Sequence, residues 1–277
     1  MSNKAIVPLV VVIALLGGLL FFLSRGGNTT TPDNTNPIPP PADRIKIDPA
    51  NVAANWSALL KVAAAPPRGS ASAPWTMVEI GDFQCPNCGE AYSMLENALK
   101  QSAGKACLYF VNYPLTHIHP HAQSAARAGL YAASVHEFWP MYDLLYAHQD
   151  ELIPSEVEYF ASQHIPSING KALYAAMSST QYDPEIDRST SEVTQLGVES
   201  TPTLFIRSPQ GKVLVYIGTG GSDYWANGTK EHAPGISSLA QTPPWGGKIP
   251  TLPTPPMPPA PTPPHAAPRA PKKPAGG

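Results

Sequence analysis

The chain has 277 residues, a formal net charge of -2 at pH 7, 34 prolines and three cysteines. A charge so close to balance gives no sign of a nucleic-acid-binding protein or of a site for acidic substrates, so no nucleic acid is expected as a partner. The prolines concentrate near residues 32–41 and after Gln241, which leaves room for one sizeable folded body between the two stretches.

An uncharged apolar run, AIVPLVVVIALLGGLLFFL, occupies residues 5–23 near the N-terminus. A helix of that length, rising about 1.5 Å per residue, is close to the thickness of a bilayer core. A removable signal peptide has a shorter apolar core and a small-residue cleavage site, which the following LSRGGNTT lacks. We expect a retained single-span anchor over residues 1–24, in the cytoplasmic membrane, with a cleaved signal as the alternative. Both interpretations place the body on the periplasmic or extracellular side, where disulfides persist.

Two further segments are too poor in apolar residues to form a core. Residues 25–44 form a Gly- and Pro-rich spacer, and residues 242–277 form a proline-rich tail with Lys and Arg but no acid. We expect this tail to be disordered and extended, and its PxxP spacings leave open a docking role. The folded domain is therefore expected over residues 45–241.

Within the folded domain, the hydrophobic pattern predicts strands and helices in a definite order. WTMVEIGDF (residues 75–83) predicts a buried strand, a helical pattern starts at Cys85, and ACLYFVNYPL (residues 106–115) predicts a second strand. This order indicates a parallel strand pair with a right-handed crossover. Residues 121–196 then predict a block of helices, and residues 201–218 predict an antiparallel hairpin around a Ser-Pro-Gln-Gly turn. A closing helix is expected between residues 219 and 241.

Cys85 and Cys88 form a CPNC motif at the junction of the first strand and the first helix. A zinc site needs four ligands, and the other candidates are Cys107, His117, His119 and His121. We expect no metal here and keep a metal site as the alternative to a redox pair. Cys107 is expected to pack as a small apolar side chain, with a third redox thiol as its alternative.

The segments DFQCPNC, HPHAQSAARA and GVESTPTLFI resemble the DsbA-like branch of the thioredoxin superfamily. The resemblance spans about residues 75–217. It implies an α/β thioredoxin fold with an inserted helical domain, at about residues 121–196, alongside the single N-terminal transmembrane helix. It also implies that the catalytic residues are Cys85, Cys88, Pro202 and Thr201, and that no cofactor is needed besides the disulfide of the cysteine pair. Pro202 would be cis and would expose the backbone of Thr201 to an extended substrate strand.

The chemistry of disulfide exchange fits cysteines at the start of a helix. Unpaired N–H groups and the positive end of the helix dipole stabilise a thiolate at Cys85. The two-residue spacing lets Cys88 reach back over one turn to form a disulfide. We expect Cys85 to be the exposed nucleophile and Cys88 the buried resolving thiol, with Pro86 and Asn87 tuning the stability of the thiolate.

Two acids and several aromatic residues near the motif invite a functional interpretation. Glu79 and Asp82 precede the helix, either as buried carboxylates that shuttle protons or as solvated acids at a strand end, and both alternatives stay open here. The aromatic residues Trp139, Tyr142 and Tyr146 are expected in the core of the helical block.

These features predict an extracytoplasmic, membrane-anchored thiol–disulfide oxidoreductase. The protein would donate its Cys85–Cys88 disulfide to reduced or misoxidised exported proteins and would be reoxidised by a membrane redox partner. It would act as a monomer, since no dimerisation domain is visible in the sequence. The alternatives are a reductase or isomerase of the same fold, or a tethered peptide-binding or scaffold protein without redox turnover.

Overall fold

The computed structural model describes residues 47–220, 236–240 and 243–244, all of which belong to one compact unit. The expected anchor and spacer and nearly all of the tail lie outside these residues. Within the described ranges, no helix is both long enough and apolar enough to cross a membrane.

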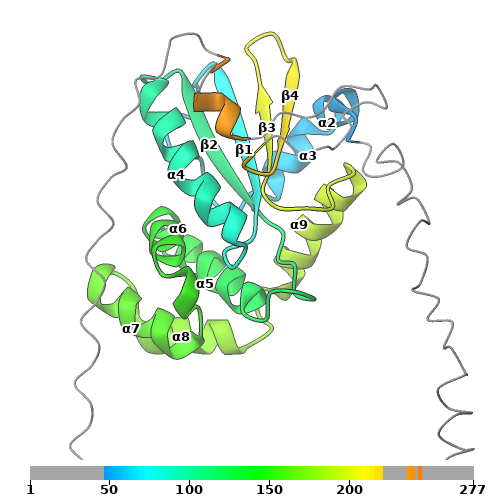
Figure 1. Cartoon of the computed structure of the whole chain (residues 1–277). Coiled ribbons are helices and arrows are strands. Elements are labelled where there is room, and N and C mark those ends of the chain that lie inside the picture. Colours follow the sequence, from blue (N-terminus) through cyan, green and yellow to red (C-terminus); the bar gives the residue numbers. More distant parts are fainter. Residues whose placement is uncertain (1–46, 221–235, 241–242, 245–277) are drawn as a thin grey trace, which may run out of the picture. The chain divides into compact units, whose positions relative to one another are not determined.

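A four-stranded sheet in the order β2-β1-β3-β4 lies at the centre of the domain (Figure 1). Its strands are β1 (Trp75–Gly81), β2 (Ala106–Asn112), β3 (Thr203–Arg207) and β4 (Val213–Ile217). β1 and β2 are parallel and are connected by α4 (Pro86–Gln101), whereas β3 is antiparallel to both β1 and β4. The predicted strand–helix–strand unit and the hairpin are therefore confirmed. The first two strands end at Gly81 and Asn112, earlier than the sequence pattern predicted.

Helices cover both faces of the sheet. One face carries α2 (Pro49–Ala54), α3 (Trp56–Lys61) and α9 (Asp183–Gln195), and the other carries α4 and the short 3-10 helix η3 (Ile236–Ala240). Side chains alternate between the two faces along a strand, so Val78 and Ile80 of β1 pack toward α2, α3 and α9, whereas Met77 packs toward α4. The alternation explains why strands buried on both faces look continuously apolar in the sequence.

Four helices inserted between β2 and α9 form a core of their own, below the sheet in Figure 1. They are α5 (Ala122–Ser134), α6 (Phe138–Ala147), α7 (Pro154–His164) and α8 (Gly170–Ser178), with the 3-10 turn η2 (Gln149–Glu151) after α6. Phe83 and Phe110 from the sheet side belong to this core and stack with their ring centroids 4.8 Å apart. The insertion therefore packs directly against the end of the sheet that carries the CPNC motif.

The segment before β1 adds structure that the sequence pattern did not predict. Besides α2 and α3, an extended stretch runs along the outer edge of β2, where Ala64 N donates to Phe110 O at 2.9 Å. Arg68 and Leu108 exchange two backbone hydrogen bonds of 2.8 and 2.9 Å. At the other end of the domain, residues 236–240 of the expected closing-helix region form the short 3-10 helix η3, and residues 221–235 lie outside the described part, so the expected helix stays a prediction there.

Candidate active site

Cys85 is the N-cap residue of α4, with an extended backbone (φ -70°, ψ 119°), and Pro86 takes the first helical position. The carbonyl oxygen of Cys85 accepts the first helical hydrogen bonds, from Cys88 N at 2.9 Å and Gly89 N at 3.2 Å. The N–H groups of Cys88 and Asn87 bond to the Cys85 sulfur and lower its pKa. The helix start thus supplies the anion-stabilising donors that the sequence motif predicted.

The two thiols of the motif have opposite acidities. A hydrogen bond from Cys88 is the largest cause that lowers the pKa of Cys85 to about 6, with further help from Thr201 and the helix N–H groups and against the effect of burial. Burial, followed by the interaction with Cys85, raises the pKa of Cys88 well above its usual value. At neutral pH the pair is therefore a thiolate at Cys85 and a protonated thiol at Cys88.

Both sulfurs are buried, which differs in part from expectation. Cys88 is fully buried as predicted, but Cys85 is only 6% exposed although it was expected to be the exposed nucleophile. Cys85 belongs to the same apolar cluster as the side chains of the insertion, which therefore shield it. Only a narrow part of the nucleophile is open to a partner.

The loop before β3 lies opposite the start of α4. Ile80 of β1 pairs with Thr203 of β3, which brings the preceding Thr201–Pro202 peptide bond, a cis bond, beside the motif. When Cys85 is protonated, its thiol donates to the carbonyl oxygen of Thr201 at 3.5 Å. The Thr201 hydroxyl oxygen is buried, and this side chain helps to lower the pKa of Cys85. The structure thus brings together all four residues to which the family resemblance assigned catalysis.

Glu79 lies completely buried near the cysteines, so the interpretation of this residue as a solvated acid is wrong. Its carboxylate accepts hydrogen bonds from the Tyr142 hydroxyl at 2.7 Å and the Tyr146 hydroxyl at 3.3 Å, both from α6. Burial raises the pKa of Glu79 to about 7, the two phenols oppose the shift, and the negative charges of Glu96 and Cys85 add to it. The tyrosines are core residues as predicted, but their hydrogen bonds to Glu79 could not be predicted from the sequence.

Asp82 is also buried, at 2% exposure, so the solvated alternative is wrong for this acid as well. It accepts hydrogen bonds from Gln84 N at 2.8 Å and Leu115 N at 2.9 Å, and its Oδ2 lies 2.7 Å from His119 Nδ1. Asp82 therefore connects the turn before Cys85 to the loop after β2. The sequence pattern did not reveal this connection.

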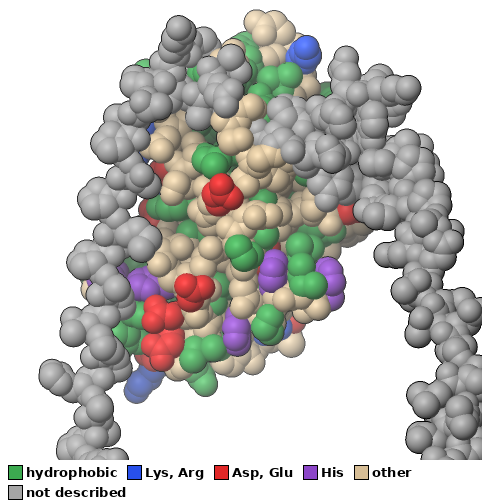
Figure 2. Space-filling view, viewed as in Figure 1, with side chains coloured by type: hydrophobic (Ala, Val, Ile, Leu, Met, Phe, Trp, Pro, Cys, Tyr) green, Lys and Arg blue, Asp and Glu red, His purple; other side chains and the backbone are tan. Residues whose placement is uncertain are grey.

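The candidate ligands of the alternative metal site do not surround a common point in the described structure. Among the described residues, no three His, Cys, Asp or Glu side chains gather as metal ligands, and histidine side chains are spread over the lower half of the face in Figure 2. Cys107 is fully buried in β2, and burial raises the pKa of its thiol. A buried, protonated thiol fits the expected packing role.

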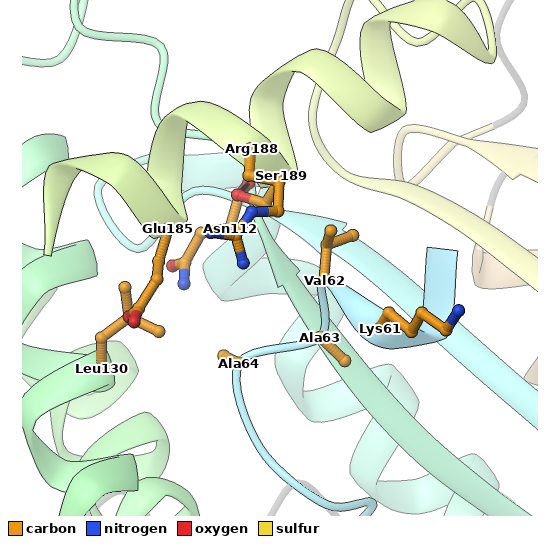
Figure 3. Close-up of a pocket in the computed structure, with 9 residues that line it drawn as sticks. All are labelled: Lys61, Val62, Ala63, Ala64, Asn112, Leu130, Glu185, Arg188 and Ser189. Carbon is orange, nitrogen blue, oxygen red and sulfur yellow. Dashed lines mark hydrogen bonds between the residues drawn. The ribbon is translucent and has the colours of Figure 1, made fainter. Parts of the chain in front are cut away.

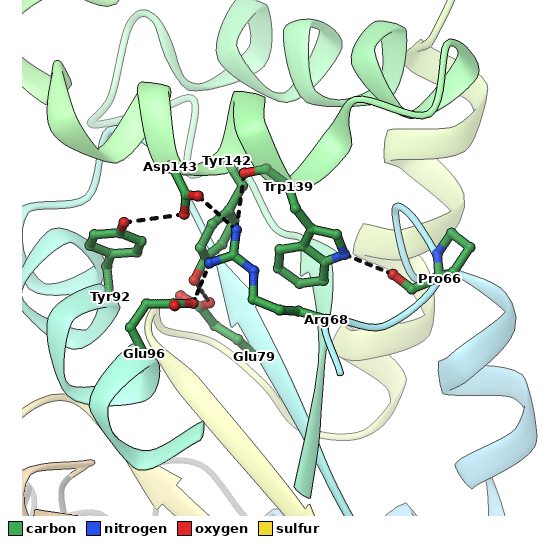
Figure 4. A network of polar contacts seen from close by, with 8 residues as sticks. All are labelled: Pro66, Arg68, Glu79, Tyr92, Glu96, Trp139, Tyr142 and Asp143. Atoms are coloured by element: carbon green, nitrogen blue, oxygen red, sulfur yellow. Dashed lines mark hydrogen bonds and ion pairs between the residues drawn. The ribbon is translucent and has the colours of Figure 1, made fainter. Parts of the chain in front are cut away.

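A cluster around Arg68 joins the segment before β1 to α4 and α6 (Figure 4). The guanidinium contacts Glu96 of α4, donates to Asp143 Oδ2 of α6 at 2.8 Å, and lies 4.7 Å from the ring centroid of Trp139. Burial raises the pKa of Glu96, and the charge of Glu96 in turn raises that of Glu79. The cluster is thus an electrostatic neighbour of the active site that sequence reasoning missed.

A pocket of about 270 Å³ lies between α3, α5, α9 and the end of β2 (Figure 3). Its lining residues are Lys61, Val62, Ala63, Ala64, Asn112, Leu130, Glu185, Arg188 and Ser189. Neither cysteine of the motif belongs to it, so the pocket is separate from the sulfur chemistry.

With this geometry in place, comparison with known proteins identifies the family. A family model described as thioredoxin matches residues 62–211, which is more than half of the chain. The chain belongs to the thioredoxin family. The expected place in the thioredoxin superfamily is thereby confirmed, as is the α/β fold with a helical insertion.

Three similar proteins show how much of their length this thioredoxin-family chain matches. The Na(+)/H(+) antiporter NhaA 3 of Salinispora tropica is 43% identical over 96 residues, which are 35% of this chain and only 15% of that protein. The probable disulfide bond formation protein D of Bacillus anthracis is 26% identical over 146 residues, 50% of this chain and 67% of that protein. The crystal structure of oxidised BdbD from Bacillus subtilis is similar over 55% of this chain and 84% of that one, with 20% identity and a TM-score of 0.48.

The geometry and the family together define the chemistry of the site. An ionised thiol at a helix N-terminus, a protonated partner thiol one turn away and a backbone carbonyl beside the nucleophile are the parts that thiol–disulfide exchange requires. The site of this thioredoxin-family chain therefore has the arrangement that suits thiol–disulfide exchange.

Proposed function

We propose that this protein is a membrane-tethered, extracytoplasmic disulfide donor that oxidises exported proteins through Cys85 and Cys88. The observation that carries the proposal is the acidity of Cys85, whose pKa of about 6 keeps it ionised at neutral pH. Stabilising the thiolate stabilises the reduced protein, and a protein whose reduced form is stabilised gives its disulfide away readily.

The proposed reaction begins with the oxidised protein and a client dithiol. A client thiolate attacks Cys85 Sγ, the Cys85–Cys88 bond breaks, and a mixed disulfide forms on Cys85 while Cys88 leaves with the electron pair. A second client thiolate then attacks the client sulfur of the mixed disulfide and releases Cys85 as a thiolate. The client loses two electrons and the protein gains them, so a membrane redox partner must remove them before the next cycle.

Glu79 is placed to handle the proton that this cycle requires. Cys88 leaves as a thiolate whose pKa is well above the usual value, so it takes up a proton at neutral pH. Glu79 interacts electrostatically with Cys88, and its own pKa of about 7 leaves it partly protonated under the same conditions. A buried acid with a pKa near the working pH is suited to general acid–base catalysis. We assign it that role in this cycle.

The direction of exchange is tested by the redox equilibrium of the purified protein with glutathione. We expect a reduction potential well above that of thioredoxin, which is about -270 mV. A potential as low as that of thioredoxin would instead assign the protein as a reductase.

A Cys85→Ser variant separates catalysis from simple client binding. Turnover of a reduced model protein should be lost, because the attacking and leaving sulfur is gone. Client binding that is strong in the wild type, together with no disulfide exchange in either protein, would support a binding or scaffold role and contradict the proposal.

The membrane placement is a proposal supported by the sequence of residues 5–23. We expect the full-length protein to sediment with membranes and to expose its folded domain to protease added outside the cytoplasmic membrane. Deleting residues 1–24 and adding a cleavable signal should release an active domain in soluble form. Sedimentation of that variant with the membrane would show that another segment is responsible.

A further inference from the structure

The side chain of Gln149 reaches from the helical insertion to the catalytic turn. It lies in η2, directly after α6, and is partly buried. Its Nε2 donates to Phe83 O at 2.8 Å and to Cys85 O at 3.0 Å. One carboxamide therefore spans the two carbonyl groups on either side of Gln84.

The position of the Gln149 carboxamide depends on the residue directly after the CPNC motif. A Cβ atom built at Gly89 would lie 2.0 Å from Gln149 Oε1 and 2.7 Å from Gln149 Cδ. Real Cβ atoms do not approach other heavy atoms so closely, so the carboxamide has room only because residue 89 lacks a side chain. The motif helix and the insertion are therefore matched to one another at this point.

Holding the Cys85 carbonyl has a direct consequence for its sulfur. Because the peptide unit is planar, the orientation of that carbonyl fixes ψ of Cys85, the torsion angle that joins the N-cap residue to the helix. This torsion angle sets where the sulfur lies relative to the N–H groups of Asn87 and Cys88 that stabilise its charge. Asp82 holds the Gln84 N–H of the same turn at 2.8 Å, and its backbone carbonyl accepts from Cys85 N at 3.0 Å, whereas Gln149 holds the Cys85 carbonyl.

We propose that Gln149 is a positioning residue that holds the Phe83–Cys85 turn and so keeps the Cys85 sulfur over the first N–H groups of α4. The inference rests on the proposed exchange at Cys85 and assigns part of its control to the insertion. The insertion thus has two effects on Cys85. Its apolar side chains cover the sulfur, and its Gln149 side chain controls how strongly the thiolate is stabilised.

Replacing the side chain tests the positioning role. In Gln149→Ala and in the similarly sized Gln149→Met, we expect the acid ionisation constant of Cys85, followed by thiolate absorbance against pH, to fall about threefold to tenfold, the effect of one or two neutral hydrogen bonds. The equilibrium with glutathione should shift by a similar factor toward the oxidised protein, because its reduced form has lost stabilisation. Gln195→Ala, which removes an exposed glutamine of α9 bonded only to Ser191, is the matched control and should change neither value.

A second variant tests the same contact from the helix side. Gly89→Ala should displace the carboxamide and reproduce the loss seen in Gln149→Ala. In the double variant the two losses should not add, because the contact is already absent. Additive losses would show that Gly89 and Gln149 act independently and would overturn the inference.

The remaining outcomes separate this inference from the proposed function. If both Gln149 variants unfold at a lower temperature but keep the ionisation of Cys85 and the glutathione equilibrium of the wild type, the side chain is only structural and the inference is wrong. If the wild type itself ionises like an ordinary thiol and exchanges no faster than one, the proposed function fails first.

Discussion

Two buried acids, Glu79 at the end of β1 and Asp82 in the loop after it, have almost the same exposure but different partners. Asp82 accepts two backbone N–H groups and lies against His119, so its lone pairs are used to connect two loops. Among the described residues, the hydrogen-bond donors to Glu79 are two phenols of α6, and burial raises the pKa of Glu79 to about 7.

The comparison shows that burial alone does not determine whether a carboxylate has a structural role or exchanges a proton. The backbone donors are fixed in place and occupy the lone pairs of Asp82, which makes this residue a structural connector. Phenols compensate the same charge less well, so Glu79 keeps a proton that it can exchange. The variants below test this difference, from the largest expected effect to the smallest.

Removing the Asp82 carboxylate should have the largest effect on stability. Asp82→Ala leaves two backbone N–H groups without their acceptor in a buried site, and we expect a loss of about 3–4 kcal/mol in the free energy of unfolding. Denaturant unfolding of the oxidised protein measures it. Asp82→Asn, which keeps an acceptor oxygen, should lose less, and equal losses in the two variants would contradict the role of the hydrogen bonds.

Glu79→Gln should have the opposite effect on stability at high pH. Because the folded-state pKa of Glu79 is raised to about 7, the wild type loses stability as the pH rises from about 4.5 to 7, whereas the amide does not titrate. We expect the oxidised variant to be more stable than the oxidised wild type by up to about 3 kcal/mol at pH 8, with little difference at pH 4. Using the oxidised form removes the separate contribution of the Cys85 thiolate, together with the small part of the Glu79 shift that the charge of Cys85 causes. A stability difference that does not change with pH would show that Glu79 does not titrate in this range.

The same Glu79→Gln variant tests the proton transfer. We expect formation of the mixed disulfide on Cys85, the step that releases Cys88, to slow by about tenfold at pH 7, a modest loss for a general acid. Stopped-flow measurement of the reaction with a reduced peptide provides the rate. An unchanged rate with the expected change in stability would mean that solvent supplies the proton.

Removing a single phenol should have a smaller effect. Since the phenols lower the pKa of Glu79, Tyr142→Phe should raise that pKa further and shift the stability profile to higher pH by up to about one unit, equivalent to roughly 1.4 kcal/mol. Tyr146→Phe removes the longer bond, 3.3 Å against 2.7 Å, and should shift the profile less. The reverse order would show that the distances do not reflect the strength of the two bonds.

His119→Ala should have the smallest effect. The two backbone donors to Asp82 remain, and we expect a loss of about 1 kcal/mol, the net value of one hydrogen bond. Denaturant unfolding at pH 7 measures it. A loss as large as that of Asp82→Ala would show that the imidazole, and not the backbone, holds the loop together.

The sequence revealed those parts of the protein that depend on neighbours along the chain. The CPNC motif at a strand–helix junction, the periodicity of α4 and the turn between β3 and β4 are local signals, and the structure has each of them. Membership of the thioredoxin superfamily followed from motifs spread over the chain rather than from any one of them.

The parts that the sequence missed depend on contacts between distant residues. Tyr142 lies 63 positions from Glu79, and Gln149 lies 64 positions from Cys85, so no local pattern connects them. A single glutamine in a short turn has no periodicity to mark it. The stretch that pairs with β2, residues 64–68, was missed for another reason, since its AAPPR sequence has no β-forming residues.

That stretch has a consequence for an enzyme whose proposed clients arrive unfolded. Nascent chains carry unpaired backbone groups that add readily to any open strand, and such addition is a route to co-aggregation. At the outer edge of β2, Ala64 and Arg68 already occupy hydrogen-bonding positions of the strand. An unfolded client of the kind proposed would therefore find these positions of the β2 edge already occupied, which protects that part of the edge from strand addition.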